Sequence, residues 1–331
     1  MKVLIAGGAG FIGSTIGSLL TDEGHQPVVL DNLVTGRREF TADRPFYEGD
    51  IADGALVDRI FAEHPDIEAV VNCAALIVVP DSVADPLGYY HANVAKGVEF
   101  LGHLVRNGCT RVLFSSSASI YRTSDDFTVD EDSAIEPLSP YARTKAIFED
   151  VLGDIAAAGQ LRVISLRYFN PIGADPELRT GLQIRKPTHA LGKMIDTHHA
   201  GEQFTITGTD YPTRDGSGIR DYVHVWDLAH AHLRALLRFD AVTADGGYRV
   251  INLGTGTGTT VRELVTAFET VIGGPLDTVE TDRRPGDSAG AYTRSTRALD
   301  LLGWKPEHSI EDGIRDSLRW YARRDEVIGT A

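Results

Sequence analysis

Short apolar runs alternate with longer stretches of helical periodicity along the first half of the chain. The runs are typical of buried strands and cover residues 1–6, 27–30, 69–72, 111–114 and 162–166. The stretches between them are typical of amphipathic helices and cover residues 14–23, 53–63, 86–107 and 141–158. Such alternation predicts an α/β fold built on a doubly wound, Rossmann-like parallel sheet.

The pattern becomes irregular after the fifth expected strand, where proline, glycine and threonine are frequent. We therefore expect a larger unit over residues 1–170 and a smaller, substrate-binding unit over residues 171–331. Residues 222–254 complicate this division, because their helix-like and strand-like segments can return to the first sheet. The boundary stays open at this stage.

Composition places the chain among ordinary globular proteins and narrows its partners. Its 331 residues, 42% of them hydrophobic and 24% charged, are enough for two packed units. A formal net charge of −15 argues against nucleic acid or an anionic membrane as a partner. Any anionic ligand must therefore be held in a local pocket.

Cysteine usage and hydropathy both favour the cytoplasm. Cys73 and Cys109 are too few for a disulfide framework and lack the spacing of a metal site, so we expect a reducing compartment and no metal. Nowhere do about 18 apolar residues run together, which argues against a membrane span. The apolar run at the start is too short for a signal peptide.

A glycine-rich turn follows the first expected strand. Gly7, Gly10 and Gly13 lead through Phe11 and Ile12 into the first helix. Glycine permits a tight turn and a close approach to a pyrophosphate, and the helix N-terminus stabilises negative charge. The turn predicts a dinucleotide site, although this spacing alone has low specificity.

The end of the second strand strengthens that prediction. Asp31 and Asn32 lie roughly 20 residues beyond the turn, where an acid accepts hydrogen bonds from a ribose diol. A carboxylate there repels a 2′-phosphate and so favours NAD over NADP. Arg37 and Arg38 keep NADP open, and a residue that merely ends a strand is the alternative for Asp31.

Tyr141 and Lys145 are the most informative pair, since residues four apart share one helix face. A tyrosine with a reference pKa of about 10 is a poor base near neutrality. A shift of about three units needs roughly 4 kcal/mol, which a nearby ammonium and a positive nicotinamide ring can supply. Ser117, and less directly Ser116, can hydrogen-bond the substrate hydroxyl that loses its proton. Serines that cap a strand and a solvated helix face are the alternative.

Together these residues resemble the extended short-chain dehydrogenase/reductase superfamily, and within it the UDP-glucose 4-epimerase family. The similarity spans nearly the whole chain, in stretches 7–13, 30–33, 49–51, 115–121, 141–145, 167–174, 208–216 and 220–225. It implies a bound NAD that takes hydride from carbon 4 of a UDP-hexose and returns it to the opposite face. In the implied mechanism Tyr141 removes the hydroxyl proton as the hydride leaves, and the 4-keto sugar turns over between the two transfers.

The resemblance also implies contacts by position. Around the cofactor, beside the glycine turn, Asp31 and Asn32, it implies Asp50, Ile51, Ala74, Asn93, Ser115, Tyr141, Lys145 and Tyr168. For the diphosphate it implies Asn170, Arg220 and Arg284, and for the uridine ribose Asp287. The remaining implied substrate contacts are Ser117, Tyr141, Thr188, His189, Thr205, Thr207 and Ala291.

Several positions depart from the family pattern. Ile77 replaces a lysine near the cofactor, and Arg122 replaces a glycine, so the tightness of NAD binding stays open. Residues 187–189 replace an asparagine-asparagine-leucine stretch, which leaves the uracil contacts open. Ala291 stands where several members carry tyrosine, and it leaves room for a 2-acetamido sugar unless Tyr292 fills the space.

Three other functions are alternatives for this chain. A sugar-nucleotide 4,6-dehydratase needs an acid after the serine strand, and residues 117–120 contain none. A 4-epimerase of a pentose or uronic-acid nucleotide is a closer alternative. A non-catalytic NAD(P)-sensing protein is a different class on the same fold, but such relatives often lack the tyrosine and the lysine.

A homodimer is also implied, because the helices near residues 93–105 and 141–152 resemble those of a four-helix dimer contact. Val94, Val98, Leu101 and Val105 fall close to one apolar stripe. Ordinary packing of that stripe on the sheet is the alternative.

Overall fold

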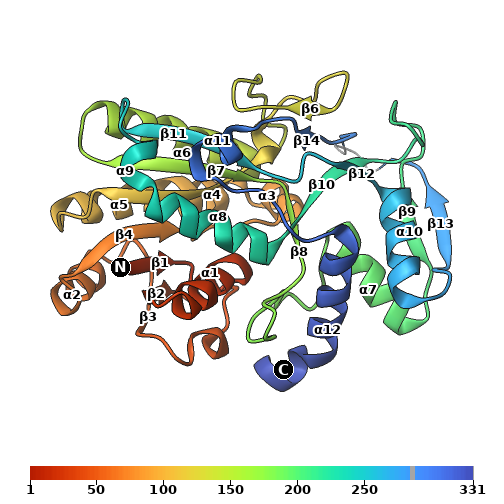
Figure 1. Ribbon diagram of the computed structural model, residues 1–331, viewed down its shortest axis with the longest axis horizontal. Helices are drawn as coiled ribbons and strands as arrows, with labels where there is room; N and C mark the ends of the chain where they lie inside the picture. Colours follow the sequence, from red (N-terminus) through yellow and green to blue (C-terminus); the bar gives the residue numbers. More distant parts are fainter. Residues whose placement is uncertain (284–287, 331) are drawn as a thin grey trace.

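The computed structural model describes residues 1–283 and 288–330, and its centre is a seven-stranded parallel sheet (Figure 1). The strand order is β11-β7-β5-β4-β1-β2-β3. These strands are β1 (Lys2–Ala6), β2 (Gln26–Asp31), β3 (Phe46–Glu48), β4 (Ile67–Asn72), β5 (Arg111–Ser117), β7 (Arg162–Tyr168) and β11 (Tyr248–Leu253). The order reverses between β1 and β4, which is the doubly wound topology. The predicted Rossmann-like α/β fold is confirmed.

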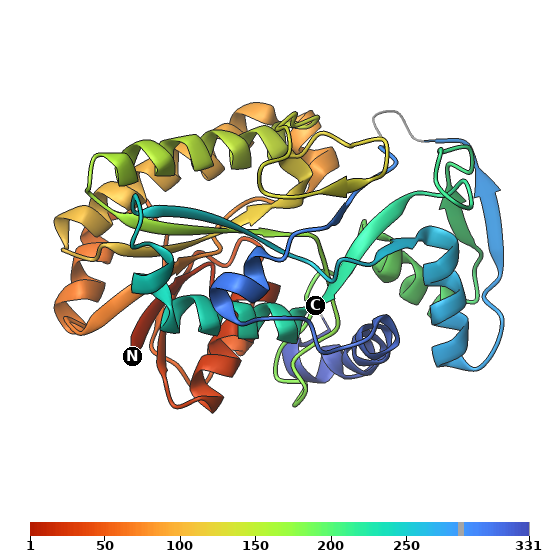
Figure 2. The same cartoon turned by 45° about the horizontal axis from the view of Figure 1, so that its top comes forward.

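Helices cover both faces of this sheet (Figure 2). Val3 and Ile5 pack toward one layer, made of α1 (Phe11–Asp22), α8 (Val225–Leu237), α9 (Phe239–Val242) and α11 (Arg297–Leu302). Leu4 and Ala6 pack toward the other layer, made of α2 (Gly54–Glu63), α5 (Lys96–Arg106) and α6 (Pro140–Ala157). Because both faces are buried, the strands are continuous apolar runs rather than alternating ones.

The helix predicted over residues 86–107 is divided in the structure. After α3 (Val79–Ala84), the chain forms α4 (Pro86–Tyr90), a π-helical turn over His91–Ala95, and then α5. A π-helical turn widens the helix locally, and such turns are frequent at functional sites. Here it carries Asn93 onto the loop that follows β4.

The start of α6 is set by Ser139 and Pro140. The Ser139 hydroxyl accepts a hydrogen bond from the Ala142 amide at 3.2 Å, and proline occupies the first helical turn. Both features are standard helix-start signals. The cap therefore fixes where the face with Tyr141 and Lys145 begins.

A smaller unit lies beside the carboxyl ends of the central strands (Figure 1). Its strands are β8 (Asn170–Ile172), β10 (Ile219–His224) and β12 (Gly258–Thr260) in one sheet, and β9 (Phe204–Thr207) with β13 (Thr278–Thr281) in another. Its helices are α7 (Ala190–Ala200), α10 (Val261–Ile272) and α12 (Ile310–Ile328). They share a core that includes Met194, Phe268 and Ile314.

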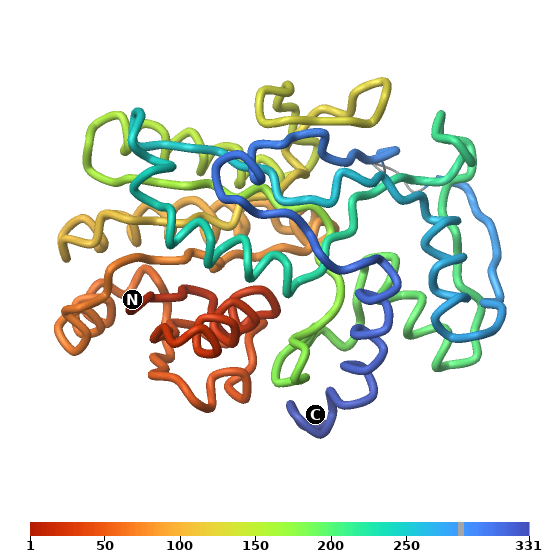
Figure 3. The backbone as a smooth tube through the Cα atoms, in the orientation of Figure 1, coloured from red at the N-terminus to blue at the C-terminus, as the bar shows by residue number. Residues whose placement is uncertain are grey.

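The chain crosses between the two units several times (Figure 3). It leaves after β7, returns through α8 to β11, leaves again for α10, and returns for β14 (Tyr292–Thr293) and α11. Strand β14 pairs with β6 (Thr128–Val129). Two short 3-10 turns lie elsewhere in the described chain, η1 (Arg38–Thr41) after β2 and η3 (Ala118–Ile120) after β5. Residues 225–253 thus pack on the first sheet, whereas the division of the chain at residue 170 stays a prediction.

Candidate active site

Lys145 lies on the second turn of α6 and points at the end of β5. Its side chain is 4% exposed, and Nζ donates a hydrogen bond to the Ser115 carbonyl oxygen at 2.6 Å. Nζ also lies 4.8 Å from the centre of the Phe114 ring. Burial lowers the pKa of Lys145 to about 8, against the opposing effects of Cys73 and Glu149. One fixed carbonyl therefore orients an ammonium that has two further N–H donors.

Tyr141 is half-buried one turn before Lys145 and faces Ser117. Burial raises the pKa of Tyr141, and a hydrogen bond with the Ser117 side chain opposes that rise. The Ser117 hydroxyl also donates to Ser119 Oγ at 2.9 Å. The structure thus brings Ser117, Tyr141 and Lys145 together at the carboxyl end of β5.

Ser116 does not join this group. Successive residues of a strand point to opposite faces, and the Ser116 hydroxyl donates to the Glu149 carboxylate beneath α6. The lesser prediction, that Ser116 contacts the reacting hydroxyl, is therefore wrong. Glu149 itself was missed, although its position four residues after Lys145 marks the same helix face.

The glycine turn between β1 and α1 forms a cradle packed so closely that Gly7 and Gly13 have no space for a Cβ. Gly7 has φ of 75°, and a Cβ there would lie 2.7 Å from the Ala74 nitrogen. A Cβ at Gly13 would lie 2.4 Å from the Gly7 oxygen, whereas at Gly10 the nearest such contact is 3.4 Å. The amides of Phe11 and Ile12 open α1 above this turn. This cradle fits the pyrophosphate of a dinucleotide.

Asp31 ends β2 with its carboxylate 8% exposed beside the turn. The carboxylate accepts hydrogen bonds from the amides of Ala9 at 3.0 Å and Leu33 at 2.8 Å. Burial raises the pKa of Asp31, and these two bonds oppose the rise. Each carboxylate oxygen keeps a lone pair for a ribose hydroxyl. Arg38 is paired with Glu48, which weakens the NADP alternative.

Asn32, Asp50 and Ile51 lie around the carboxyl ends of β2 and β3. Asp50 forms an ion pair with Lys96 at 2.5 Å, and the exposed Asn32 amide lies 3.5 Å from the same carboxylate. Burial raises the pKa of Asp50, but the hydrogen bond from Lys96 and others outweigh it, so the net change is downward. Ile51 packs into the core beneath. Lys96 was not predicted here, because its partner is distant in sequence.

Asn93 and Ala74 lie at the end of β4. The Asn93 amide donates to the Leu76 carbonyl at 2.9 Å and to Thr144 Oγ1 at 3.1 Å, and its oxygen accepts from the Leu76 amide. Asn93 thus fastens the loop that carries Ala74 to α6. Ala74 is the residue that lies against Gly7.

Tyr168 and Ser115 complete the floor of the site. Tyr168 is buried on β7, level with Ser117 in the ladder, and its hydroxyl is hydrogen-bonded to His232. Burial lowers the pKa of His232 to about 4, so this histidine is neutral. Ser115 contributes the carbonyl that holds Lys145.

Asn170 and Arg220 lie on neighbouring strands of the smaller unit. Asn170 starts β8 and pairs in register with Tyr222 of β10, the strand that also carries Arg220. The Arg220 guanidinium donates to the carbonyls of Ile219 at 2.7 Å and Ala289 at 2.8 Å. Main-chain carbonyls therefore orient this group without neutralising its charge.

The other predicted substrate residues are more dispersed. Thr188 is exposed, and His189 caps α7 by accepting a hydrogen bond from the Gly192 amide at 3.2 Å. Burial lowers the pKa of His189 to about 4, so it is a neutral cap. Thr205 is exposed and Thr207 half-buried on β9. Arg284 and Asp287 lie outside the described residues.

Ala291 is half-buried just before β14. The neighbouring Tyr292 ring lies over Gly258, where an added Cβ would be 2.4 Å from the ring. The Tyr292 ring therefore packs on Gly258. Of the two departures near the cofactor, Ile77 is 54% exposed and Arg122 lies 3.8 Å from Glu136.

The apolar stripe on α5 is split between core and surface. Leu101 is buried in the core, whereas Val98 and Val105 are exposed, as is Ile147 on α6. Val94, in the π-helical turn, is half-buried. Packing on the sheet thus accounts for Leu101 and leaves the other positions on the surface.

Two features are absent from the part of the chain that the structure describes, a metal-binding group and a membrane-spanning helix. Within residues 1–283 and 288–330, no three His, Cys, Asp or Glu side chains are grouped to hold a metal ion. In the same residues, no helix combines the length and apolarity that crossing a bilayer requires.

Comparison with known proteins places the chain in a family. Residues 3–254 match the NAD dependent epimerase/dehydratase family. The chain is 42% identical over 334 aligned residues to UDP-glucose 4-epimerase of Azospirillum brasilense, covering 100% of this chain and 94% of that protein.

Solved structures agree over the whole length. The UDP-glucose 4-epimerase of Stenotrophomonas maltophila, with bound NAD and formylated UDP-arabinopyranose, has a TM-score of 0.93 and 35% identity, covering 98% of this chain and 99% of that one. The enzyme of Bifidobacterium longum, in complex with NAD+ and UDP, has a TM-score of 0.90 and 32% identity, with full coverage of both chains (100%). The chain therefore belongs to the NAD dependent epimerase/dehydratase family.

Proposed function

We propose that the protein interconverts UDP-glucose and UDP-galactose by NAD-dependent 4-epimerisation. The observation that carries this proposal is the convergence of Ser117, Tyr141 and Lys145 at the end of β5. The names and ligands of the similar proteins support it, since they are UDP-glucose 4-epimerases crystallised with NAD and uridine nucleotides.

The proposed cofactor site follows the carboxyl edge of the central sheet. Gly7 and Gly13 permit the tight turn, and Gly10 leaves room for a pyrophosphate. The amides of Phe11 and Ile12 stabilise its charge, and Asp31 accepts from the adenosine ribose. When bound there, NAD would supply the acceptor for the hydride of sugar carbon 4 and the donor that returns it to the opposite face. Asn32, Asp50, Ile51, Ala74, Asn93, Ser115 and Tyr168 complete this proposed site.

Proton transfer is assigned to Tyr141. Its phenol oxygen removes the proton of the 4-hydroxyl group, Ser117 Oγ holds that hydroxyl in line, and the Lys145 ammonium stabilises the phenolate. Lys145 acts from a poorly hydrated position, where one charge has a larger effect on its neighbour than it has in water.

Substrate binding must be firm at the diphosphate and loose at the sugar, because the 4-keto sugar has to turn over. Asn170 and Arg220 are assigned to the diphosphate, since a guanidinium held by carbonyls is a fixed anion ligand. Arg284 belongs to the same proposed grip, with Asp287 on the uridine ribose. Thr188, His189, Thr205 and Thr207 are proposed around the nucleotide.

The pocket for the sugar is proposed to admit 2-acetamido hexoses. Ala291 is small, and the Tyr292 ring is occupied on Gly258, which keeps this side chain from filling the space. A pentose nucleotide is a second candidate substrate, because the similar Stenotrophomonas enzyme holds a UDP-arabinopyranose derivative.

A cytoplasmic homodimer is part of the same proposal. Exposed Val98, Val105 and Ile147 offer apolar surface on α5 and α6 for a second copy. The cysteines Cys73 and Cys109 are both free thiols, which suits a reducing compartment.

The deciding experiment incubates purified protein with UDP-galactose, with and without added NAD, and follows UDP-glucose by NMR. We expect a mixture of the two sugars to form without net NADH, and UDP-N-acetylgalactosamine to react as well. Tyr141→Phe is the matched control, because it keeps the ring and removes the proton acceptor. If the NAD-bound protein converts neither UDP-hexose, pentose and uronic-acid nucleotides become the proposed substrates. If it converts none of these either, the result favours a non-catalytic NAD(P)-sensing protein.

A further inference from the structure

A row of polar side chains crosses the apolar central sheet at its carboxyl edge. Ser116 of β5 pairs in register with Arg167 of β7, which pairs with Asn252 of β11. Residues in register on neighbouring strands point to the same face. All three therefore face α6, where the surrounding side chains are hydrophobic.

Glu149 on α6 binds two members of this row, Ser116 and Arg167. Its carboxylate accepts from Arg167 Nε at 3.0 Å, from Arg167 Nη2 at 2.5 Å and from the Ser116 hydroxyl. The side chains of Glu149 and Arg167 are each 7% exposed. This is a two-pronged, buried ion pair with an additional hydrogen bond, the geometry that a buried charge requires.

The other side of Arg167 is held equally firmly. Nη1 donates to the Tyr121 hydroxyl at 2.7 Å, and the guanidinium lies 4.9 Å from the centre of the Tyr121 ring. Tyr121 donates in turn to the Asn252 side-chain oxygen at 2.6 Å, and the main-chain N–H of Asn252 donates to the Glu131 carboxylate at 2.7 Å. The network thus joins α6, β7, β11 and the loop that begins at Ser117.

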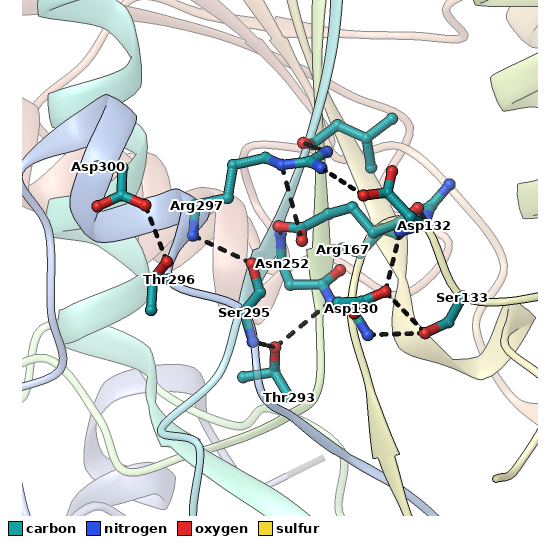
Figure 4. Close-up of polar contacts among 12 residues, drawn as sticks. Asp130, Asp132, Ser133, Arg167, Asn252, Thr293, Ser295, Thr296, Arg297 and Asp300 are labelled. Carbon is teal, nitrogen blue, oxygen red and sulfur yellow. Dashed lines mark hydrogen bonds and ion pairs between the residues drawn. The ribbon is translucent and has the colours of Figure 1, made fainter.

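Figure 4 shows the outer part of this network. The side-chain amide of Asn252 donates a hydrogen bond to Thr293 Oγ1 of β14 at 3.4 Å, and Arg297 Nη2 donates to Asp132 Oδ2 at 3.1 Å. The segment beside Ala291 is therefore tied to the same row as the catalytic helix.

Glu149 extends the reacting face of α6. Tyr141, Lys145 and Glu149 follow at intervals of four residues, so they lie along one side of the helix. Lys145 fastens this side to the Ser115 carbonyl, and Glu149 fastens it to Ser116 and Arg167. Two successive turns of α6 are thus joined to two successive residues of β5.

We infer that Glu149 and Arg167 form a positioning pair for epimerisation, which fixes α6 against β5 and β7 so that Tyr141 meets Ser117. The inference rests on the proposed function for its rate measurements only. Buried ion pairs contribute little net stability compared with apolar replacements, whereas a displacement of about 1 Å in a reacting group can reduce the rate by about 100-fold.

The pair also sets the charge beneath the site. The titratable groups that face Lys145 and Tyr141 are Cys73, Tyr89, Tyr168 and Glu149. Burial raises the pKa of Cys73 to about 12, and it also raises the pKa values of Tyr89 and Tyr168, so these three are neutral. Glu149 is the carboxylic acid among them, and it is paired with Arg167.

The first test compares Glu149→Gln with Asp150→Asn in the NAD-loaded protein. The former removes a buried negative charge and leaves Arg167 unneutralised, which favours neutral Lys145 and the Tyr141 phenolate. We expect both limbs of the kcat–pH profile to move to lower pH by roughly half a unit or more, with KM for UDP-galactose unchanged. Asp150 is exposed on the same helix, so Asp150→Asn should leave the profile in place.

The second test separates position from charge. Glu149→Leu/Arg167→Met removes both charges together and fills the same space, so the protein should fold and its pH profile should return toward that of the wild type. We expect the kcat of the double variant to be about 10- to 100-fold lower than that of the wild type, with NAD content and KM unchanged. Wild-type kcat in this double variant would overturn the inference, because the pair would then be merely structural.

A third measurement does not depend on the substrate. Ultraviolet difference absorbance between each protein and its Tyr141→Phe form reports the phenolate of Tyr141 as pH rises. Glu149→Gln should lower the Tyr141 transition, and Asp150→Asn should not; an unchanged transition in Glu149→Gln would contradict the charge effect. Should the wild type epimerise no hexose, an unchanged Tyr141 transition in Glu149→Gln would still overturn the link between the pair and Tyr141. Should Glu149→Gln not fold, the double variant decides it.

Discussion

Lys145 is the residue whose environment most constrains the chemistry. A buried ammonium loses hydration, and burial lowers its pKa to about 8 from the ordinary value of 10.5. The Ser115 carbonyl and the Phe114 ring recover only part of that loss. The fold therefore maintains a destabilising charge at the place where a phenolate needs one.

Lys145→Met is accordingly expected to raise stability while it abolishes epimerisation. A gap of about 2.5 units corresponds to roughly 3 kcal/mol, an upper value because the Ser115 contact is lost. Below pH 8 both the folded and the unfolded wild type carry the proton, so the gain is full; it declines as pH rises from 8 toward 10.5. Urea unfolding of both proteins at pH 7 and pH 10 measures the difference, and equal stability at pH 7 would contradict the buried-charge account.

The size of residue 291 is expected to govern which sugars are accepted. Ala291→Tyr should reduce kcat/KM for UDP-N-acetylgalactosamine by at least about tenfold, because an acetamido group no longer fits beside the ring. Turnover of UDP-galactose should change much less. Ala291→Ser is the matched control of similar volume, and parallel assays of both sugars give the ratio.

At this scale the sequence predicts residues that share one short motif better than residues that meet across the fold. Tyr141 and Lys145 lie on one helix face, and Gly7 and Gly13 lie in one turn, so their spacing in the sequence already places the members of each pair near one another. The bond between Ser116 and Glu149, and the pair of Asp50 and Lys96, depend on how α5 and α6 dock, which spacing does not contain.

The turn between β1 and α1 is the element that the backbone constrains most tightly. Gly13 packs its Cα against the Gly7 carbonyl, whereas the Cβ direction of Gly10 is more open within the protein. The two glycines thus serve different purposes, one in packing and one in leaving room for a ligand.

A pair of alanine variants separates these purposes. Gly13→Ala should lower the free energy of unfolding by roughly 1–3 kcal/mol, because a Cβ 2.4 Å from the Gly7 oxygen forces the helix away. Gly10→Ala should leave stability within about 0.5 kcal/mol but weaken NAD binding at least about tenfold. Thermal unfolding without NAD and calorimetric titration with NAD provide the two measurements; equal effects of the two variants on both would contradict this division.

The limits of the elements were predicted well where a cap signal is local, and less well where packing decides. Ser139 and Pro140 mark the start of α6 in the sequence as in the structure. The π-helical turn at His91–Ala95 was not predicted, because residues with ordinary helical periodicity fill it. The contact of Asn93 with Leu76 and Thr144 accompanies that extra width.

For the molecule as a whole, the expected dimer gives the most direct test. Val98 is 41% exposed on α5, and a charge there would be buried without a partner if two copies meet at this surface. Val98→Asp should therefore give a particle of about half the wild-type mass in light scattering. Leu237→Asp, on the exposed side of α8 at 56%, is the matched control and should not change the mass. A monomeric wild type would contradict the dimer.

The architecture was predictable as a class but not in its connections. Alternating runs predict a parallel sheet, and residues 222–254 were recognised as candidates to rejoin it. Which strand β11 pairs with was not predictable, because its apolar sequence suits either edge of the sheet. The pairing with β7 places Asn252 beside Arg167, and so it also determines the polar row.

The late position of β11 has a consequence for biosynthesis. Strand β7 ends at Tyr168, but its neighbour begins at Tyr248, so the sheet keeps an open edge while some eighty residues are translated. During that interval the nascent chain exposes unpaired main-chain groups of β7 to other chains. A fragment that ends near residue 170 would carry the glycine turn and Tyr141, yet it would be a template for aggregation rather than a domain.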